Sequence, residues 1–197
     1  MVSLIKFRVI AMNDTQKKTL LKVARDTVEA VISRKPVVVP KSNEPELNAH
    51  CGCFVTLKNH GRLRGCIGQF TSDVPLIELV ADMAKASATG DPRFFSNPIK
   101  AGELNRLDVE ISVLSPLKKT DEPLSLRLGI DGIYIKKGYA SGCFLPQVAT
   151  EAGWNREEFL SYCCTHKAGL APDAWQDADT EVYLFTADAF GAEFKDL

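Results

Sequence analysis

Residues 63–68, with the sequence LRGCIG, carry the residue types best suited to chemistry in this chain. In an extended strand residues two apart share a face, so Arg64 and Cys66 are predicted to point the same way. Gly65 and Gly68 place no side chain beside the thiol, which predicts the close approach of a ligand or of another backbone. Because a nearby guanidinium favours a thiolate, this arrangement is typical of a reactive cysteine. The alternative is a small buried Cys66 beside an Arg64 that forms a salt bridge.

Positive charge gathers around this segment, at Lys58, His60, Arg62 and Arg64. The loop after Gly68 leads into a predicted helix, whose free N–H groups and dipole attract anions. A carboxylate or phosphate ligand therefore fits here, and the alternative is a solvated hairpin tip. The glycine spacing matches neither the phosphate-cradling loop nor the dinucleotide fingerprint, which argues against nucleotide binding.

The hypothesis of a reactive site gives Arg64 an anionic group to hold and makes Cys66 the nucleophile, with Glu110 or a histidine as proton acceptor. The sequence selects none of the histidines, which are His50, His60 and His166. Glu110 could instead be exposed, or pair with an arginine such as Arg64 or Arg93, because a buried carboxylate needs a partner.

Asp91, Arg93 and Gln147 are predicted as supporting polar groups of the ligand site, together with Gly65 and Gly68. For residues 91–93 the alternative is a stop signal after a helix, in which Asp91 bonds the backbone of the turn and Arg93 pairs locally.

A metal site is not predicted, although His50, Cys51, Cys53, His60 and Cys66 lie close in the sequence. One residue separates Cys51 from Cys53, which is closer than the usual spacing of zinc ligands. The two cysteines also fit the apolar face of a strand, which explains them as core residues. No cofactor is predicted.

The elements that must position these residues follow from periodicity and turn signals. A first helix is predicted over 15–33, with Asn13 or Asp14 as its N-cap. A second is predicted over 73–89, with Ser72 as its N-cap and Gly90 as a C′ glycine. A third is predicted from the capping box Asn155–Glu158 to near Gly169. Strands are predicted as a hairpin over 51–68 turning at 59–61, at 107–113, as a second hairpin over 133–145, and at 180–186. The fold class is therefore α+β, with largely antiparallel or mixed sheets and packed helices.

The composition is that of an ordinary globular protein. The 197 residues predict one compact unit, 45% of them are hydrophobic, and the net charge is −1. A near-neutral charge gives no support to nucleic-acid binding, and no apolar run reaches the ~18 residues of a membrane span. Lys6 and Arg8 interrupt the segment where a signal peptide needs an apolar core, so a cytoplasmic protein with reduced cysteines is expected.

Several blocks in order make the chain resemble the AMMECR-one family. The first is the segment 63–68, preceded by the block FVTL at 54–57. The others are DPRF at 91–94, VEISVL at 109–114, FLPQVA at 144–149, Trp154, and KAGL at 167–170. The resemblance covers residues 13–197 as one domain of two lobes, with residues 1–12 as an N-terminal extension.

The resemblance implies an α+β fold of two unequal lobes, with the cysteine segment near a cleft between them. It implies no established reaction, and whether the protein is an enzyme stays open. Microbial members are often found beside Memo-like, dioxygenase-related proteins and radical-SAM proteins. Two hypotheses follow: a site for an anionic small molecule or modified residue centred on Cys66 and Arg64, or a non-catalytic adaptor that binds a Memo-like or radical-SAM partner.

Overall fold

The computed structural model describes residues 10–197, which form two compact units. The larger unit comprises residues 10–114 and 188–197, and the smaller comprises residues 115–187. Lys6, Arg8 and most of the expected N-terminal extension lie outside the described residues. Within residues 10–197, no helix combines the length and the apolar character needed to cross a membrane.

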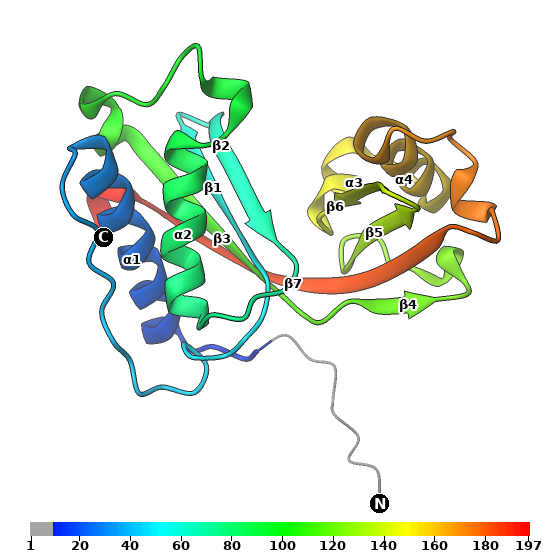
Figure 1. Ribbon diagram of the computed structural model, residues 1–197, viewed down its shortest axis with the longest axis horizontal. Coiled ribbons are helices and arrows are strands. Elements are labelled where there is room, and N and C mark those ends of the chain that lie inside the picture. The colour runs from blue at the N-terminus through cyan, green and yellow to red at the C-terminus, as the bar shows by residue number, and fades with distance from the viewer. Residues whose placement is uncertain (1–9) are drawn as a thin grey trace, which may run out of the picture. The chain divides into compact units, whose positions relative to one another are not determined.

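The larger unit is a sheet with two helices on one face (Figure 1). Its strands are β1 (Cys53–Asn59), β2 (Arg62–Gln69), β3 (Leu107–Leu114) and the last part of β7 (Glu181–Glu193), in the order β2-β1-β3-β7. β1 lies between β2 and β3 and is antiparallel to both. The helices are α1 (Asp14–Ile32) and α2 (Leu76–Thr89), and the 3-10 turns are η1 (Pro92–Phe94), η2 (Ala101–Arg106) and η6 (Phe194–Asp196). The predicted hairpin and the α+β class are confirmed.

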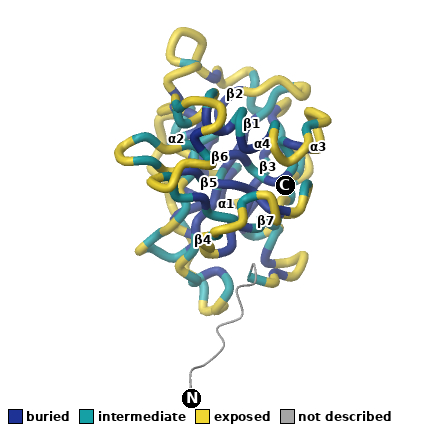
Figure 2. Tube along the Cα trace, turned by 90° about the vertical axis from the view of Figure 1, so that its right-hand side faces the viewer, coloured by how far each residue is buried: buried dark blue, intermediate teal, exposed yellow. Residues whose placement is uncertain are grey.

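Alternation along the strands explains the core of this unit. Val55 and Leu57 of β1 and Val109 and Ile111 of β3 are fully or almost fully buried and belong to one cluster with the apolar stripes of α1 and α2. Neighbouring positions in these strands point to the other face of the sheet. Figure 2 shows buried positions along the strands and mostly exposed connecting loops.

The helix ends differ in how far the sequence predicts them. The Asn13 side chain accepts from the Gln16 N–H at 2.9 Å, and the Gln16 side chain accepts from the Asn13 N–H, so the predicted cap is confirmed. The predicted start of α2 is wrong by three residues, because the Ser72 hydroxyl bonds Val74 instead of a helical N–H. Gly90 ends α2 with a φ of −115°, not in the left-handed conformation expected of a C′ glycine.

The smaller unit has its own sheet and core. β5 (Asp131–Lys137) pairs with β6 (Ala140–Phe144) and with the first part of β7, and β4 (Lys118–Thr120) pairs with β7. The other elements are η3 (Pro123–Ser125), α3 (Gln147–Ala152), α4 (Arg156–Cys163), a π-helical turn η4 (Cys164–Ala168) and η5 (Ala174–Gln176). The predicted capping box at Asn155 and Glu158 is confirmed, and Gly169 ends η4 with a φ of 67°.

The last strand is longer than predicted. The sequence predicts a strand over 180–186, whereas β7 runs over 13 residues to Glu193. Ala and Asp are uncommon in strands, so Ala187, Asp188 and Ala189 do not predict the part of β7 that belongs to the larger unit.

Candidate functional site

A β-bulge interrupts the strand that carries the cysteine segment. Cys66 pairs with Thr56 and Gly65 with Leu57, but the next pair along β1 joins Lys58 to Leu63. Arg64 is therefore the extra residue of the bulge. Because a bulge breaks strict alternation, the rule that residues two apart share a face does not extend from Cys66 to Arg64.

Arg64 forms a buried ion pair with Glu103 of η2. Only 8% of Arg64 is exposed, and its Nε and Nη2 atoms donate to the two Glu103 carboxylate oxygens at 3.1 and 3.2 Å. Its guanidinium also lies 5.8 Å from the centre of the Phe94 ring. Of the two interpretations that the sequence leaves open for Arg64, the geometry is that of the salt bridge.

Glu103 was not predicted, yet its carboxylate accepts four hydrogen bonds, as many as that of Asp91. Besides Arg64, it accepts from the Asn59 amide and from the Lys100 backbone N–H, both at 3.0 Å. Burial by itself raises the pKa of Glu103, but these donors outweigh burial and lower the pKa below its ordinary value. The carboxylate is therefore ionised and its oxygens are already occupied.

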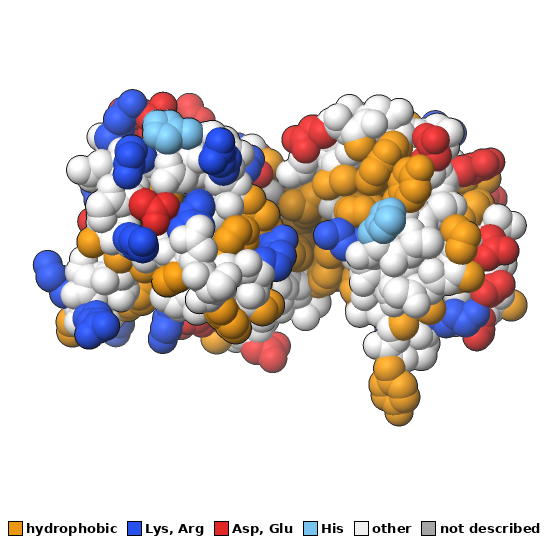
Figure 3. Space-filling view, turned by 90° about the horizontal axis from the view of Figure 1, so that it is seen from above, with side chains coloured by type: hydrophobic (Ala, Val, Ile, Leu, Met, Phe, Trp, Pro, Cys, Tyr) orange, Lys and Arg blue, Asp and Glu red, His pale blue; other side chains and the backbone are white. Residues whose placement is uncertain are grey.

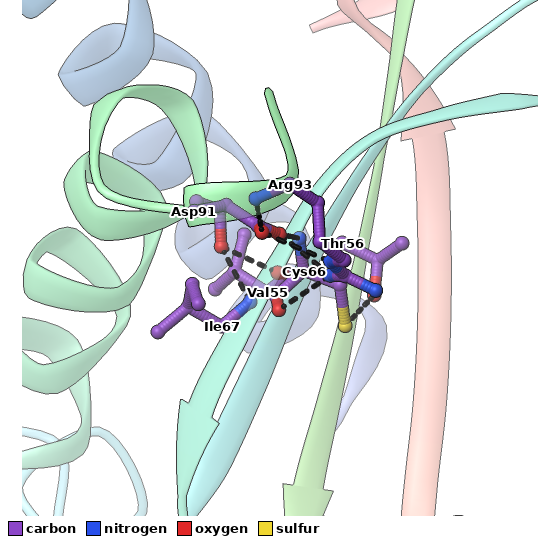
Figure 4. Close-up of polar contacts among 7 residues, drawn as sticks. Val55, Thr56, Cys66, Ile67, Asp91 and Arg93 are labelled. Carbon is purple, nitrogen blue, oxygen red and sulfur yellow. Dashed lines mark hydrogen bonds and ion pairs between the residues drawn. The ribbon is translucent and has the colours of Figure 1, made fainter. Parts of the chain in front are cut away.

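Cys66 lies at the outer edge of β2, where other residues hold its backbone (Figure 4). Its N–H donates to Asp91 Oδ2 at 2.9 Å, and its C=O accepts from Arg93 Nη2 at 3.3 Å. The half-buried thiol is 3.2 Å from the Thr56 hydroxyl. The structure thus brings Asp91 and Arg93 to the backbone of Cys66, and neither of these two contacts involves the thiol.

Asp91 and Arg93 form a tight local pair at this edge. Arg93 Nη2 and Nε donate to the buried Asp91 carboxylate at 2.6 and 2.9 Å, and the Arg93 N–H also donates to it. The hydrogen bonds from Arg93, helped by the one from Cys66, outweigh burial and lower the pKa of Asp91 to about 2.

The space beside the two glycines is filled by the protein itself, and of the two predicted alternatives it is another backbone that approaches Gly65. A Cβ at Gly65 would overlap the backbone carbonyl of Ser87 in α2, and one at Gly68 would overlap the Phe54 ring. The Ser87 hydroxyl donates to the Val55 carbonyl at 2.7 Å and accepts from the Ile67 N–H at 2.9 Å. The glycines therefore serve the packing of α2 and Phe54 on the hairpin.

Glu110 has a partner other than Cys66, and Gln147 belongs to another unit. Glu110 pairs with Lys58 at 3.4 Å, not with Arg64 or Arg93. Thr56 stands between Cys66 and Glu110 in the sheet, and two steps of ~4.8 Å separate β2 from β3, which prevents direct proton exchange. Gln147 begins α3 and belongs to the smaller unit.

A hollow of about 890 Å³ lies beside the hairpin turn, and we call it the cationic pocket. Its lining consists of Asn59, His60, Arg62, Leu63, Arg64, Arg93, Phe94, Asn97, Lys100, Glu103 and Arg106. Five of these are Lys or Arg and one is a carboxylate, and Figure 3 shows Lys and Arg side chains gathered on this face of the larger unit. Neither Cys66 nor Glu110 lines it.

Sequence reasoning found the hairpin side of this pocket and missed the other side. His60, Arg62 and Arg64 come from the predicted basic cluster. Lys100, Glu103 and Arg106 come from η2, a 3-10 segment that has no apolar periodicity to predict it. A run of charged residues between Lys100 and Arg106 was the available signal.

Of the other cysteines, Cys53, Cys163 and Cys164 are buried, and Cys51 and Cys143 are half-buried. Burial raises the pKa of Cys51 to about 11 and also raises those of Cys53, Cys163 and Cys164. Within residues 10–197, no group of three or more His, Cys, Asp or Glu side chains is arranged to hold a metal ion.

Comparison with known proteins identifies the family. The AMMECR1 family model matches residues 21–190. The chain belongs to the AMMECR-one family. A protein of Methanothermobacter thermautotrophicus is 43% identical to this chain over 180 residues, which cover 88% of this chain and 92% of that protein. A protein of Thermococcus kodakarensis is 42% identical over 194 residues, which cover 93% of each chain. The crystal structure of an uncharacterised protein from Pyrococcus horikoshii, 41% identical, aligns over 94% of this chain and 95% of that one with a TM-score of 0.85.

Proposed function

We propose that this AMMECR-one protein binds an anionic ligand in the cationic pocket. The observation that carries the proposal is the charge of the lining, where five cationic side chains face one carboxylate whose oxygens are already hydrogen-bonded. A volume of about 890 Å³ lies within the range of small-molecule sites.

The proposal assigns different roles to the arginines than the sequence does. Arg64 forms an ion pair with Glu103, so in this proposal it stabilises the lining of the pocket and is not the sole contact of the ligand. Arg62, Lys100 and Arg106 are exposed at the pocket, and within the described part of the chain none of them forms an ion pair. Because anions bind most strongly to cations that have no counterion, these three side chains are the principal ligand contacts.

A nucleophilic Cys66 with Glu110 as proton acceptor has less support. Cys66 does not line the pocket, and Thr56 separates it from Glu110. Any proton exchange between the two would pass through the Thr56 hydroxyl, which contacts the thiol. The proposed function is therefore binding, and Asp91 and Arg93 link the strand at Cys66 to the pocket.

Docking of a partner protein is the second candidate, and the exposure of Phe95 favours it. Phe95 is 64% exposed and directly follows the pocket residue Phe94. Aromatic and arginine side chains are enriched among the residues that contribute most to protein–protein binding, and both types occur here. If a Memo-like or radical-SAM partner docks here, the Phe95→Ser variant is expected to lose binding to it and the Lys85→Gln variant to keep binding. Co-purification of the two proteins measures this.

The test of ligand binding is isothermal titration with inorganic pyrophosphate and with citrate as anion probes. The double variant Arg62→Gln/Lys100→Gln is expected to bind at least tenfold more weakly, or about 1.4 kcal/mol, because two uncompensated charges are removed. The matched control is Lys85→Gln, which removes an exposed lysine of α2 that does not line the pocket.

Circular dichroism melting checks that each variant is folded. The proposal is overturned if neither probe binds the wild-type protein. It is also overturned if the control weakens binding as much as the double variant, since the attraction would then be a property of the whole surface.

A further inference from the structure

We infer that the ligand of the cationic pocket carries two or more phosphate groups, as an oligophosphate or a multiply phosphorylated small molecule does. The inference rests on the proposed function and deepens it. Its basis is the balance of charge, the balance of hydrogen-bond donors and acceptors, and the small number of apolar residues in the lining.

The charge balance sets the number of negative charges. Of the five cations of the lining, Arg64 is neutralised by Glu103 and Arg93 by Asp91. Arg62, Lys100 and Arg106 remain, and within residues 10–197 no carboxylate lies within ion-pair distance of them. A ligand with one negative charge would leave most of their mutual repulsion in place, whereas about three charges would balance it.

The hydrogen-bonding groups favour a ligand that accepts and does not donate. Arg62, Lys100, Arg106 and Asn97 all present N–H donors to the pocket, whereas the carboxylate of Glu103 already accepts four hydrogen bonds. Donors outnumber acceptors in the lining, although the amide oxygens of Asn59 and Asn97 can accept, so a ligand rich in acceptors makes the most hydrogen bonds. Phosphate oxygens accept from several directions and suit both the forked guanidinium and the point charge of a lysine.

The apolar part of the lining is small. It consists of Leu63 and Phe94, and the Phe94 ring already has the guanidinium groups of Arg64 and Arg93 at 5.8 and 5.6 Å from its centre. The Phe94 ring is therefore already in contact with two guanidinium groups, and we expect the charged side chains of the lining to select the ligand. Its volume is several times that of one phosphate, which leaves room for two or three in a row.

The test compares orthophosphate, pyrophosphate, tripolyphosphate and citrate by isothermal titration at one fixed ionic strength. The expected result is an affinity that rises at least tenfold from orthophosphate to tripolyphosphate, with citrate at least fivefold weaker than tripolyphosphate. Arg106→Gln is expected to reduce the preference for tripolyphosphate over orthophosphate at least threefold, while Lys85→Gln leaves it unchanged.

The outcomes separate the two proposals. If either citrate or orthophosphate binds as tightly as tripolyphosphate, the inference of an oligophosphate ligand is overturned, whereas the proposal that the pocket binds anions is supported. If no anion binds, both fail. If tripolyphosphate binds but Arg106→Gln and Lys85→Gln have equal effects, the preference belongs to the general surface charge and the inference is again overturned.

Discussion

Gly65 is important for the packing of the larger unit because it has no side chain. The backbone of α2 at Ser87 occupies the position where a side chain would stand. This contact lets the Ser87 hydroxyl reach Val55 and Ile67 and bond both strands of the hairpin. The unusual composition of residues 63–68 therefore reflects the contact between helix and hairpin, independently of any ligand.

The loss of stability on substituting each of three glycines by alanine should increase with the steric hindrance that the new Cβ meets. Gly65→Ala is expected to lower the free energy of unfolding by about 3 kcal/mol or to prevent folding, because backbone must move. Gly68→Ala meets the Phe54 ring, which can rotate, and the Cys53 carbonyl oxygen less closely than Gly65→Ala meets that of Ser87, and it should cost about 1 to 3 kcal/mol. Urea denaturation measures all three.

Gly102→Ala is the matched control, since nothing lies within 4 Å of its Cβ position and its φ is not positive. It should change the stability by less than about 0.5 kcal/mol. A Gly65→Ala variant as stable as Gly102→Ala would show that α2 does not pack on the hairpin as described.

At the scale of elements, a short turn completes the edge of a sheet. β2 is the outer strand of its sheet, and η1 brings Asp91 and Arg93 to the outward N–H and C=O of Cys66. Asp91 also accepts from the Arg93 N–H and so begins η1. One carboxylate thus fixes the end of α2, the turn that follows it and the strand beside it.

Asp91→Asn should lower stability in a pH-dependent way. The pKa of Asp91 falls from 3.8 to about 2 in the folded protein, so its contribution is complete above the unfolded pKa and is lost as the pH falls from about 4 towards 2. With allowance for solvent screening at the half-exposed Arg93, the loss at pH 7 is about 1 to 2 kcal/mol. Urea denaturation at pH 7 and near pH 2 is the measurement.

The difference between wild type and Asp91→Asn should therefore shrink in acid. Asp82→Asn, at an exposed position of α2, is the control and should have little effect at either pH. If Asp91→Asn lowers the free energy of unfolding by the same amount at both pH values, the negative charge of Asp91 is not the source of the stabilisation.

At the scale of the whole molecule, the sequence predicts what is local. The α+β class follows from periodicity, and the capping boxes at Asn13 and Asn155 follow from residues three apart. The Arg64–Glu103 pair joins residues 39 apart, and no short-range pattern predicts it. The bulge at Arg64 is also hidden, because it depends on how β2 is paired.

Within residues 10–197 the chain passes between its two units twice, between residues 114 and 115 and between 187 and 188. The larger unit is therefore made from two separate stretches of sequence, and β7 supplies the second. Prediction from the alternation of apolar side chains ends this strand at Thr186, which explains why the boundary between the lobes could not be placed from the sequence.

The Asp91–Arg93 contacts at β2 also bear on the solubility of the protein. An outer strand with free backbone groups can recruit strands of other molecules and start aggregation. Here the outward N–H and C=O of Cys66 are occupied, and the bulge at Arg64 disturbs the regular edge that an incoming strand would need. Loss of this turn would thus expose the molecule to self-association even where folding survives.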